Sequence, residues 1–180
     1  MTHAATGLLD RYQEYRTRRW QANEERMAGI LPGWRTRRRR RALVVTVAAA
    51  NATMFVTGLL CAFGLRSAPL ILLPAMIVFL PAWTILRIAS SRHDSAPVQV
   101  LDELEIAQRN AARSIGLAIT QGLTMLPVAY LMIAGTVAPE ADAFRTAYAG
   151  SLMTLATLLA GGCAPAMILG WTRPDPDPEP

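Results

Sequence analysis

The sequence predicts an all-α membrane protein that crosses the bilayer four times, as two transmembrane hairpins. Amphipathic helices are expected on the cytoplasmic side, at the N-terminus and between the hairpins. Hydrophobic residues make up 52% of the 180 residues and charged residues only 17%, which is a low charged share for a soluble domain. The charges also cluster in a few segments, and the long tracts between them carry none, a pattern that soluble proteins seldom show.

Four uncharged tracts are long enough to cross a bilayer as helices. A helix rises ~1.5 Å per residue and the hydrocarbon layer is ~30 Å thick, so a span needs about 20 mostly apolar residues. The tracts are Ala42–Phe63, Pro69–Leu86, Ile115–Gly135 and Ala147–Trp171. Helices are expected rather than strands, because backbone groups in lipid must pair within their own segment and the tracts lack the polar alternation of a barrel.

Prolines occur within three of these tracts, where each is expected to kink or locally open its helix. They are Pro74, Pro81, Pro127 and Pro165. The second tract is short and also begins with a proline, Pro69. A re-entrant hairpin that does not cross the bilayer is therefore the alternative for residues 69–86.

The arginines set the expected orientation. All eighteen basic residues are arginine, and sixteen of them share one side of the membrane if the N-terminus is cytoplasmic, which leaves only Arg66 and Arg145 outside. Short arginine-rich segments stay in the cytoplasm, so both termini are expected there. The lack of lysine and the abundance of alanine suggest a GC-rich bacterial genome, and the expected location is the bacterial inner membrane. The leader before the first tract is too long for a signal peptide, and no cleavage is expected.

These tracts divide the chain into five segments. They are a basic amphipathic cytoplasmic segment (1–41), a first transmembrane hairpin (42–88), a cytoplasmic linker helix (89–114), a second hairpin (115–171) and a disordered acidic and proline-rich tail (172–180). A helix is expected from Gly7 to Ala28 in the first segment. In the third, a helix beginning near Pro97, with Ser95 as a candidate cap, should lead into the third span.

Six arginines stand directly before the first span. They are Arg35, Arg37, Arg38, Arg39, Arg40 and Arg41. Their first expected role is to anchor this side in the cytoplasm, where each basic residue near the inner leaflet also gains ~1 kcal/mol from anionic lipid. Together with Trp20 and Trp34 they form the candidate surface for lipid or another polyanion. Nucleic acid is the alternative, although no recognition motif accompanies the arginines.

No Asp, Glu, Lys, Arg or His lies within the four tracts, although ion transport and hydrolysis inside a membrane usually need such a side chain. We therefore expect no catalytic residue, no metal, no cofactor and no enzymatic activity. Asn51 and Gln121 are expected to form hydrogen bonds between helices, and a neutral polar pathway around them is the alternative. Outside the spans, Asp102 and Glu105 could ligate a divalent cation with His93, but acids in a first helical turn more often complement the helix dipole.

The fourth tract carries the clearest packing pattern. Gly162, Ala166 and Gly170 recur every four residues, and small residues at this spacing let two helices approach closely. We expect close packing there, against another span of this chain or of a second copy. Cys61 and Cys163 fall toward opposite faces of the membrane and are expected to be free.

We identify no family motif in this sequence. The expected function is that of a non-catalytic accessory or scaffold protein of the membrane. Its spans would pack with a partner protein or a second copy, and its cytoplasmic parts would contact anionic lipid or a partner. The alternatives are a small oligomeric transporter or channel subunit, and a membrane component of DNA-transfer or secretion machinery.

Overall fold

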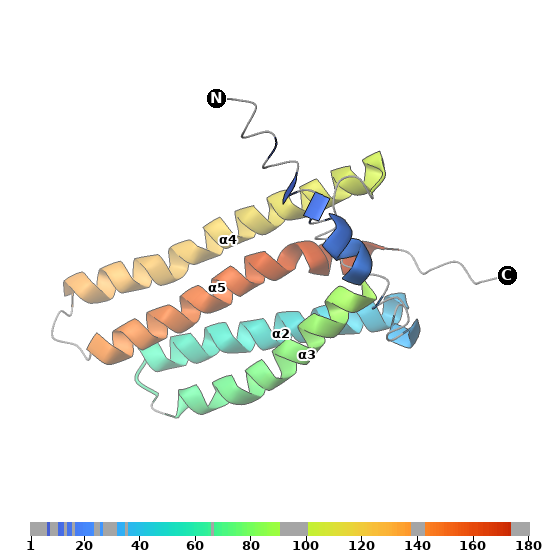
Figure 1. The fold of residues 1–180 in the computed structure, drawn as a ribbon. Coiled ribbons are helices and arrows are strands. Elements are labelled where there is room, and N and C mark those ends of the chain that lie inside the picture. The colour runs from blue at the N-terminus through green and yellow to red at the C-terminus, as the bar shows by residue number, and fades with distance from the viewer. Residues whose placement is uncertain are drawn as a thin grey trace.

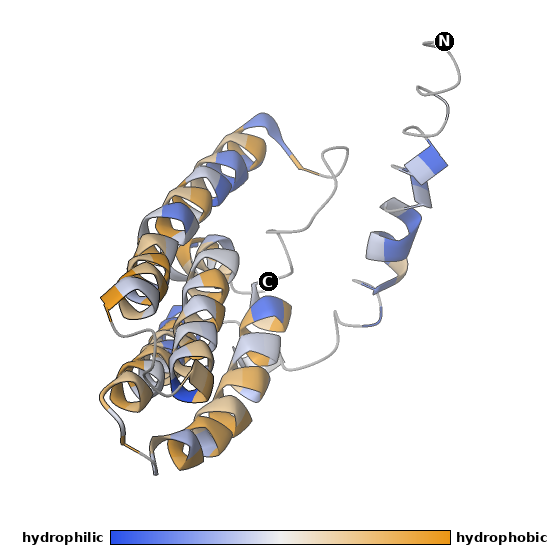
Figure 2. Ribbon diagram, turned by 90° about the vertical axis from the view of Figure 1, so that its left-hand side faces the viewer, coloured by the Kyte–Doolittle hydropathy of each residue, from blue (hydrophilic) through white to orange (hydrophobic). Residues whose placement is uncertain are grey.

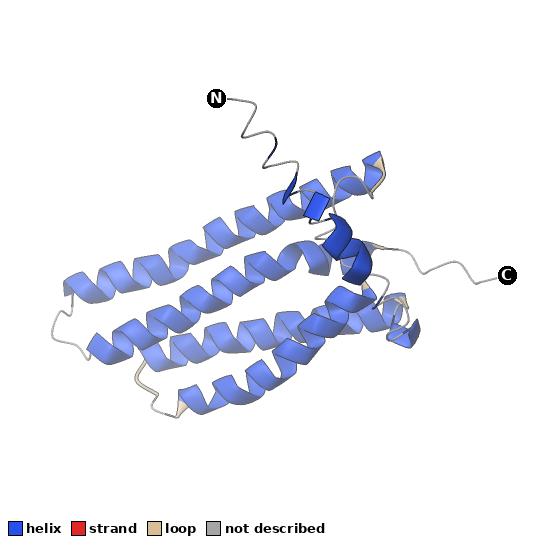
Figure 3. Ribbon diagram, in the orientation of Figure 1, coloured by secondary structure: helices blue, strands red, loops and turns tan. Residues whose placement is uncertain are grey.

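The computed structural model describes residues 32–34, 36–65, 67–90, 101–137 and 143–173, together with residues 7, 11–12, 14–15, 17–23 and 26. Within these residues every regular element is a helix and none is a strand (Figure 3). The all-α prediction is therefore confirmed. Four of the helices are long and apolar enough to cross a membrane, which agrees with the predicted number of spans.

Three of the four long helices match their uncharged tracts to within five residues, and the third tract lies inside a helix that begins twelve residues before it. The long helices are α2 (Arg37–Ala62), α3 (Leu72–Ala89), α4 (Glu103–Val137) and α5 (Ala143–Thr172), and two short 3-10 helices, η1 (Pro32–Trp34) and η2 (Ala68–Ile71), precede α2 and α3. In the helix expected from Gly7 to Ala28, each described residue between Gly7 and Arg26 is helical, and Ala28 lies outside the described residues.

The end of α2 is set by Gly64. Its φ of +87° lies in the left-handed region, which favours glycine because other residues carry a Cβ. The Gly64 N–H donates to the carbonyl of Cys61 at 2.9 Å, and the Leu65 N–H donates to that of Leu60 at 3.0 Å. These two bonds satisfy carbonyls that the helix end would leave unpaired, and they turn the chain toward η2.

The proline-rich second tract forms one continuous helix and not a re-entrant hairpin. Pro69 lies in η2 and Pro74 in the first turn of α3, where a missing backbone N–H costs little. Pro81, Pro127 and Pro165 lie inside α3, α4 and α5, and each of these helices continues past its proline.

The linker helix and the third span are a single helix, α4. A reciprocal pair of hydrogen bonds closes its first turn: the Glu105 N–H donates to Asp102 Oδ1 at 2.7 Å, and the Asp102 N–H donates to Glu105 Oε2 at 3.4 Å. This is a capping box, which starts α4 at Glu103. Ser95 and Pro97 lie outside the described residues. No break separates residues 103–114 from residues 115–137.

The helices lie side by side in the order α4, α5, α2, α3 (Figure 1). The extensive contacts join α4 to α5, α5 to α2, and α2 to α3, while α3 also touches α5. The central helix is therefore α5, the last in sequence. Of the four, α4 is the least buried, because α5 is the only helix it packs against extensively.

Small residues allow α5 to make these close contacts. A Cβ at Gly58 of α2 would lie 2.8 Å from the Met153 side chain of α5. On the α4 side, a Cβ at Gly116 would lie 2.8 Å from the carbonyl oxygen of Gly161. On the α3 side, a Cβ at Gly170 would lie 3.1 Å from Leu86. The backbones thus approach to distances that larger side chains would prevent.

Apolar residues run along the length of the bundle, and hydrophilic residues gather in the first turns of α4 and in the N-terminal helical residues (Figure 2). The main buried cluster lies between α2, α3 and α5 and contains Val47, Met54, Phe79, Leu86 and Ala156. The exterior is also rich in large apolar side chains, among them Leu73, Ile77, Met125 and Leu158. Such an exterior is typical of a surface that does not face water.

Candidate functional site

One end of the bundle, which we call the arginine end, contains the start of α2 and α4 and the end of α3 and α5. Arg40 donates from Nη2 to the carbonyl oxygen of Arg173 at 2.8 Å, and Arg173 reaches the carbonyl oxygen of Ser90 at 3.5 Å. These bonds join the ends of α2, α5 and α3. Hydrogen bonds from a charged donor are stronger than those between neutral groups, so these two bonds hold the three helix ends together.

The arginines before and within the first turns of α2 have different surroundings. Arg40 is only 2% exposed, so it is a structural residue and not part of an open surface. Arg41 is half-buried, and its guanidinium lies 4.7 Å from the centre of the Trp171 ring. Arg37, Arg38 and Arg39 are exposed, and Arg35 lies outside the described residues. Only the exposed arginines offer most of their surface to a charged ligand.

Three tryptophans at the arginine end each carry an arginine over the ring. The guanidinium of Arg39 lies 5.6 Å from the Trp34 ring centre, and that of Arg87 lies 5.6 Å from the Trp83 ring centre. Arg41 on Trp171 is the third pair. Such cation–π contacts stabilise both groups, and tryptophan with arginine is the composition of a membrane–water interface. Sequence reasoning missed Trp83 and Trp171, although both lie near the ends of uncharged tracts. Trp20 is half-buried.

A small polar cavity of about 120 Å³ lies where α3, α4 and α5 meet at the arginine end. Ser90, Glu105, Arg109 and Arg173 line it with three further residues. Arg109 is 5% exposed, so α4 also contributes a buried arginine to this end. With a carboxylate and two guanidiniums on its walls, the cavity does not present one sign of charge to a ligand.

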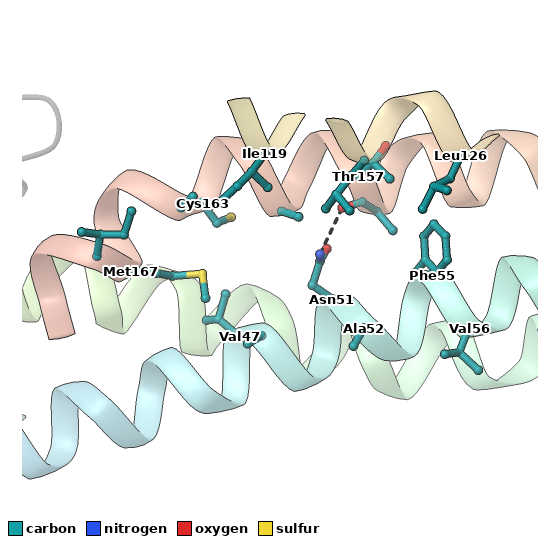
Figure 4. Close-up of a pocket in the computed structure, with 16 residues that line it drawn as sticks. Val47, Asn51, Ala52, Phe55, Val56, Ile119, Leu126, Thr157, Cys163 and Met167 are labelled. Carbon is teal, nitrogen blue, oxygen red and sulfur yellow. Dashed lines mark hydrogen bonds between the residues drawn. The ribbon is translucent and has the colours of Figure 1, made fainter. Parts of the chain in front are cut away.

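A larger hollow, which we call the groove, is lined by three helices, α2, α4 and α5. Its volume is about 510 Å³, and its walls are residues of 47–56 in α2, 119–126 in α4 and 156–168 in α5. Almost all of these residues are apolar. Phe55 and Leu126 face each other at one end, and the side chains of Val47 and Met167 approach each other nearer the other (Figure 4). The sequence alone gave no sign of this groove, because it depends on how the helices are arranged.

The two amides expected to act within the spans point to different sides. Asn51 lines the groove, and its Nδ2 donates to the carbonyl oxygen of Ala156 at 3.0 Å, which joins α2 to α5 (Figure 4). Its Oδ1 is buried and has no hydrogen-bond partner among the described residues. Gln121 is exposed. It follows the groove residue Ile119 by two positions, which turns it by about 200° to the opposite side of α4. The structure does not bring Asn51 and Gln121 together.

The small-residue pattern of α5 is only partly engaged within this chain. Ala166 and Gly170 are buried, whereas Gly162 is exposed and a Cβ added there would meet no atom within 4 Å. The neighbouring Gly161 makes the close contact instead, since a Cβ there would run into Thr120 of α4. On the α4 side, the intrachain contact is thus one residue away from the expected stripe, whereas Gly170 of the stripe contacts Leu86 of α3.

The remaining polar side chains act locally. Thr124 and Thr157 lie 3.3 Å apart across α4 and α5, and several other threonines donate to the carbonyl four residues earlier, as Thr46 does to Ala42. Cys61 and Cys163 are both buried and are not joined in a disulfide, as expected. Among the described residues no three metal-ligating side chains gather. Asp102 and Glu105 cap α4, and His93 lies outside the described residues.

No protein-family model, curated protein or solved structure matches this chain.

Proposed function

We propose that this chain is an accessory or scaffold protein of the bacterial inner membrane. It crosses the bilayer four times with the arginine end in the cytoplasm, against anionic lipid, and it associates with a second copy of itself through α4. The observation that carries the proposal is Gln121, an amide exposed in the middle of an apolar helix face.

That face, which we call the outer face of α4, consists of Leu117, Gln121, Met125, Val128 and Met132. All five are exposed, and their spacing of three and four residues places them on one side of the helix. Gln121 follows the start of the third uncharged tract, Ile115, by six residues, or ~9 Å along the helix. In a bilayer its amide would therefore lie in hydrocarbon.

An amide in hydrocarbon without a hydrogen-bond partner costs roughly 4 to 8 kcal/mol relative to water. A partner helix relieves this cost. A carboxamide carries both donors and an acceptor, so two copies of Gln121 related by a twofold axis could bond each other reciprocally. Methionines on either side are flexible enough to fill the contact between two such helices.

The placement of the amides gives less support to a transport function. A neutral polar pathway would need Asn51 and Gln121 to line one path. Asn51 of α2 lines the groove, whereas Gln121 lies on the side of α4 that faces away from the groove. A role in nucleic-acid binding would use Arg37, Arg38 and Arg39, which are exposed, whereas Trp34 lies against Arg39.

The test is the dimerisation of full-length chains labelled for energy transfer in liposomes, measured as the ratio of lipid to protein is raised. Wild type should show concentration-dependent transfer, and Gln121→Leu should weaken dimerisation about 3- to 15-fold, since a hydrogen bond between membrane helices contributes ~0.6 to 1.7 kcal/mol. Gln121→Asn should retain most of the transfer.

Thr84→Val is the matched control. Thr84 is exposed on α3 but donates to Leu80 of its own helix, so its loss should leave dimerisation unchanged. No energy transfer in wild type at any ratio, or equal transfer in wild type and Gln121→Leu, would refute association through this face.

A further inference from the structure

The groove is long, narrow and apolar. It follows about 14 Å of α2, between Val47 and Val56, and about 18 Å of α5, between Ala156 and Ile168. Two of the polar groups on its walls are engaged in helix contacts: Asn51 Nδ2 donates to the carbonyl of Ala156, and the Thr157 hydroxyl donates to the carbonyl of Thr154. The Asn51 Oδ1 atom is buried. An occupant would therefore meet mainly hydrocarbon.

The groove is too small to enclose a whole helix. A helix of ~10 Å diameter would occupy well over 1,000 Å³ in a length of 18 Å, roughly three times the space present. A hydrocarbon chain fits better. A cavity of 150 Å³ holds benzene, or ~25 Å³ per carbon, so a groove of about 510 Å³ has room for about 20 carbons, the size of one acyl chain.

The position of the groove along the bundle is the second clue. Its walls on α2, α4 and α5 lie near the middle of each uncharged tract, and on α2 and α5 they extend toward the arginine end as far as Val47 and Ile168. On α2 the groove residue Ala48 shares a side of the helix with Arg41 and Arg37, seven and eleven positions earlier. On α5, Trp171 follows the groove residue Ile168 by three positions and lies beneath the Arg41 guanidinium. One end of an apolar groove is thus close to positive charge.

From this combination we infer that the groove binds one acyl chain of an anionic phospholipid of the cytoplasmic leaflet, with its phosphate at the exposed Arg37 and beside Arg41, which is half-buried on Trp171. Guanidinium groups bind phosphate oxygens through charge-assisted hydrogen bonds, and the positive end of the α2 dipole adds to the attraction. This inference rests on the membrane orientation proposed above but not on the dimer. The inference gives the groove a function as a lipid-binding site.

The experiment measures lipid retained by the full chain purified in mild detergent, with phosphatidylglycerol and phosphatidylcholine offered in equal amounts and counted by native mass spectrometry. Wild type should keep one phosphatidylglycerol in preference. Ala52→Phe places a ring in the groove from an exposed position of its wall, and the bound fraction should fall about tenfold. Ala49→Phe is the control, because Ala49 is equally exposed on α2 but does not line the groove, and it should bind as wild type does.

Arg37→Gln with Arg41→Gln tests the charged end separately. This double variant should lose the preference for phosphatidylglycerol, by about fivefold for each arginine, while it still retains a lipid. Equal retention of the two lipids by wild type, or unchanged retention by Ala52→Phe, would overturn the inference. So would loss of energy transfer between copies in Ala52→Phe with lipid still bound, because a second copy would then fill the groove. Failure of the Gln121→Leu test alone would leave the groove result standing.

Discussion

At the scale of single residues, two neighbouring glycines of α5 differ completely in their surroundings. Gly161 is buried, and a Cβ there would collide with Thr120 and lie 2.8 Å from the carbonyl oxygen of Gly116. Gly162 is exposed with nothing within 4 Å of an added Cβ. Only the first position therefore requires glycine for the packing of α4 on α5.

We accordingly expect Gly161→Ala to lower the free energy of unfolding by about 1 to 3 kcal/mol, as overpacking of a close contact does. Gly162→Ala should leave it unchanged or raise it by about 0.5 to 1 kcal/mol, because alanine loses less conformational freedom in a helix. Denaturant titration of the detergent-solubilised chain measures both. Equal effects of the two substitutions would show that α4 does not pack on α5 at this crossing.

The arginines also differ at this scale. Arg40 is enclosed and bonded to the last described residue of the chain, whereas Arg38, two positions earlier, is exposed. A cluster that looks uniform in the sequence is divided by helical periodicity, because consecutive positions point about 100° apart. The buried Arg40 thus joins helix ends, whereas exposed arginines such as Arg38 are the ones available to anchor this end in the cytoplasm.

At the scale of elements, α4 is one helix that combines a polar first part with a long apolar part. The Asp102–Glu105 capping box fixes where it starts, and both acids also lie near the positive end of its dipole. These two carboxylates therefore have a structural role that their spacing alone did not distinguish from cation binding.

Asp102→Ala should open the first turn of α4, since loss of an N-cap costs about 0.5 to 2 kcal/mol. Hydrogen exchange at the amides of residues 103–106 should accelerate accordingly, while amides in the middle of α4 exchange as in wild type. Glu103→Gln, in the same turn but outside the capping box, is the control. If both substitutions change exchange equally, the effect comes from the helix dipole rather than from the cap.

At the scale of the whole molecule, the arrangement α4, α5, α2, α3 brings several helix ends to the arginine end of the bundle. Most of the described arginines of the four long helices lie there. At the other end Arg145, close to Gly64, is the one described arginine. This asymmetry is the physical basis for the orientation we propose, because arginine resists transfer across the bilayer.

A fluorescent reporter that folds only in the cytoplasm should accordingly be active when fused after Pro180. The same reporter inserted between α4 and α5, at residue 140, should be inactive. The opposite pattern of reporter activity would show that the orientation is the reverse of the one we propose.

A purified chain that stays dissolved and monomeric without detergent would contradict membrane insertion altogether.

The number of long helices followed from the sequence because the relevant quantity, an uncharged length, belongs to each tract separately. The helix limits followed less closely, because α2 includes the arginines before Ala42 and α4 includes the charged residues before Ile115. The sequence also placed Pro81 and Pro127 inside helices, as the structure does, because backbone groups in lipid must pair within their own segment. Asp102 and Glu105 were recognised in the sequence as acids of a first helical turn, but only the structure shows that they form a capping box.

Only the tertiary structure decided which helices are neighbours and which faces meet. Spans that are apolar on every side give little indication of their buried face, so close approach of backbones selects it. That selection placed Gly161 rather than Gly162 at a contact, turned Asn51 and Gln121 to different sides, and left the groove between α2 and α4. Local solvation thus determined the elements, and shape complementarity determined how they fit together.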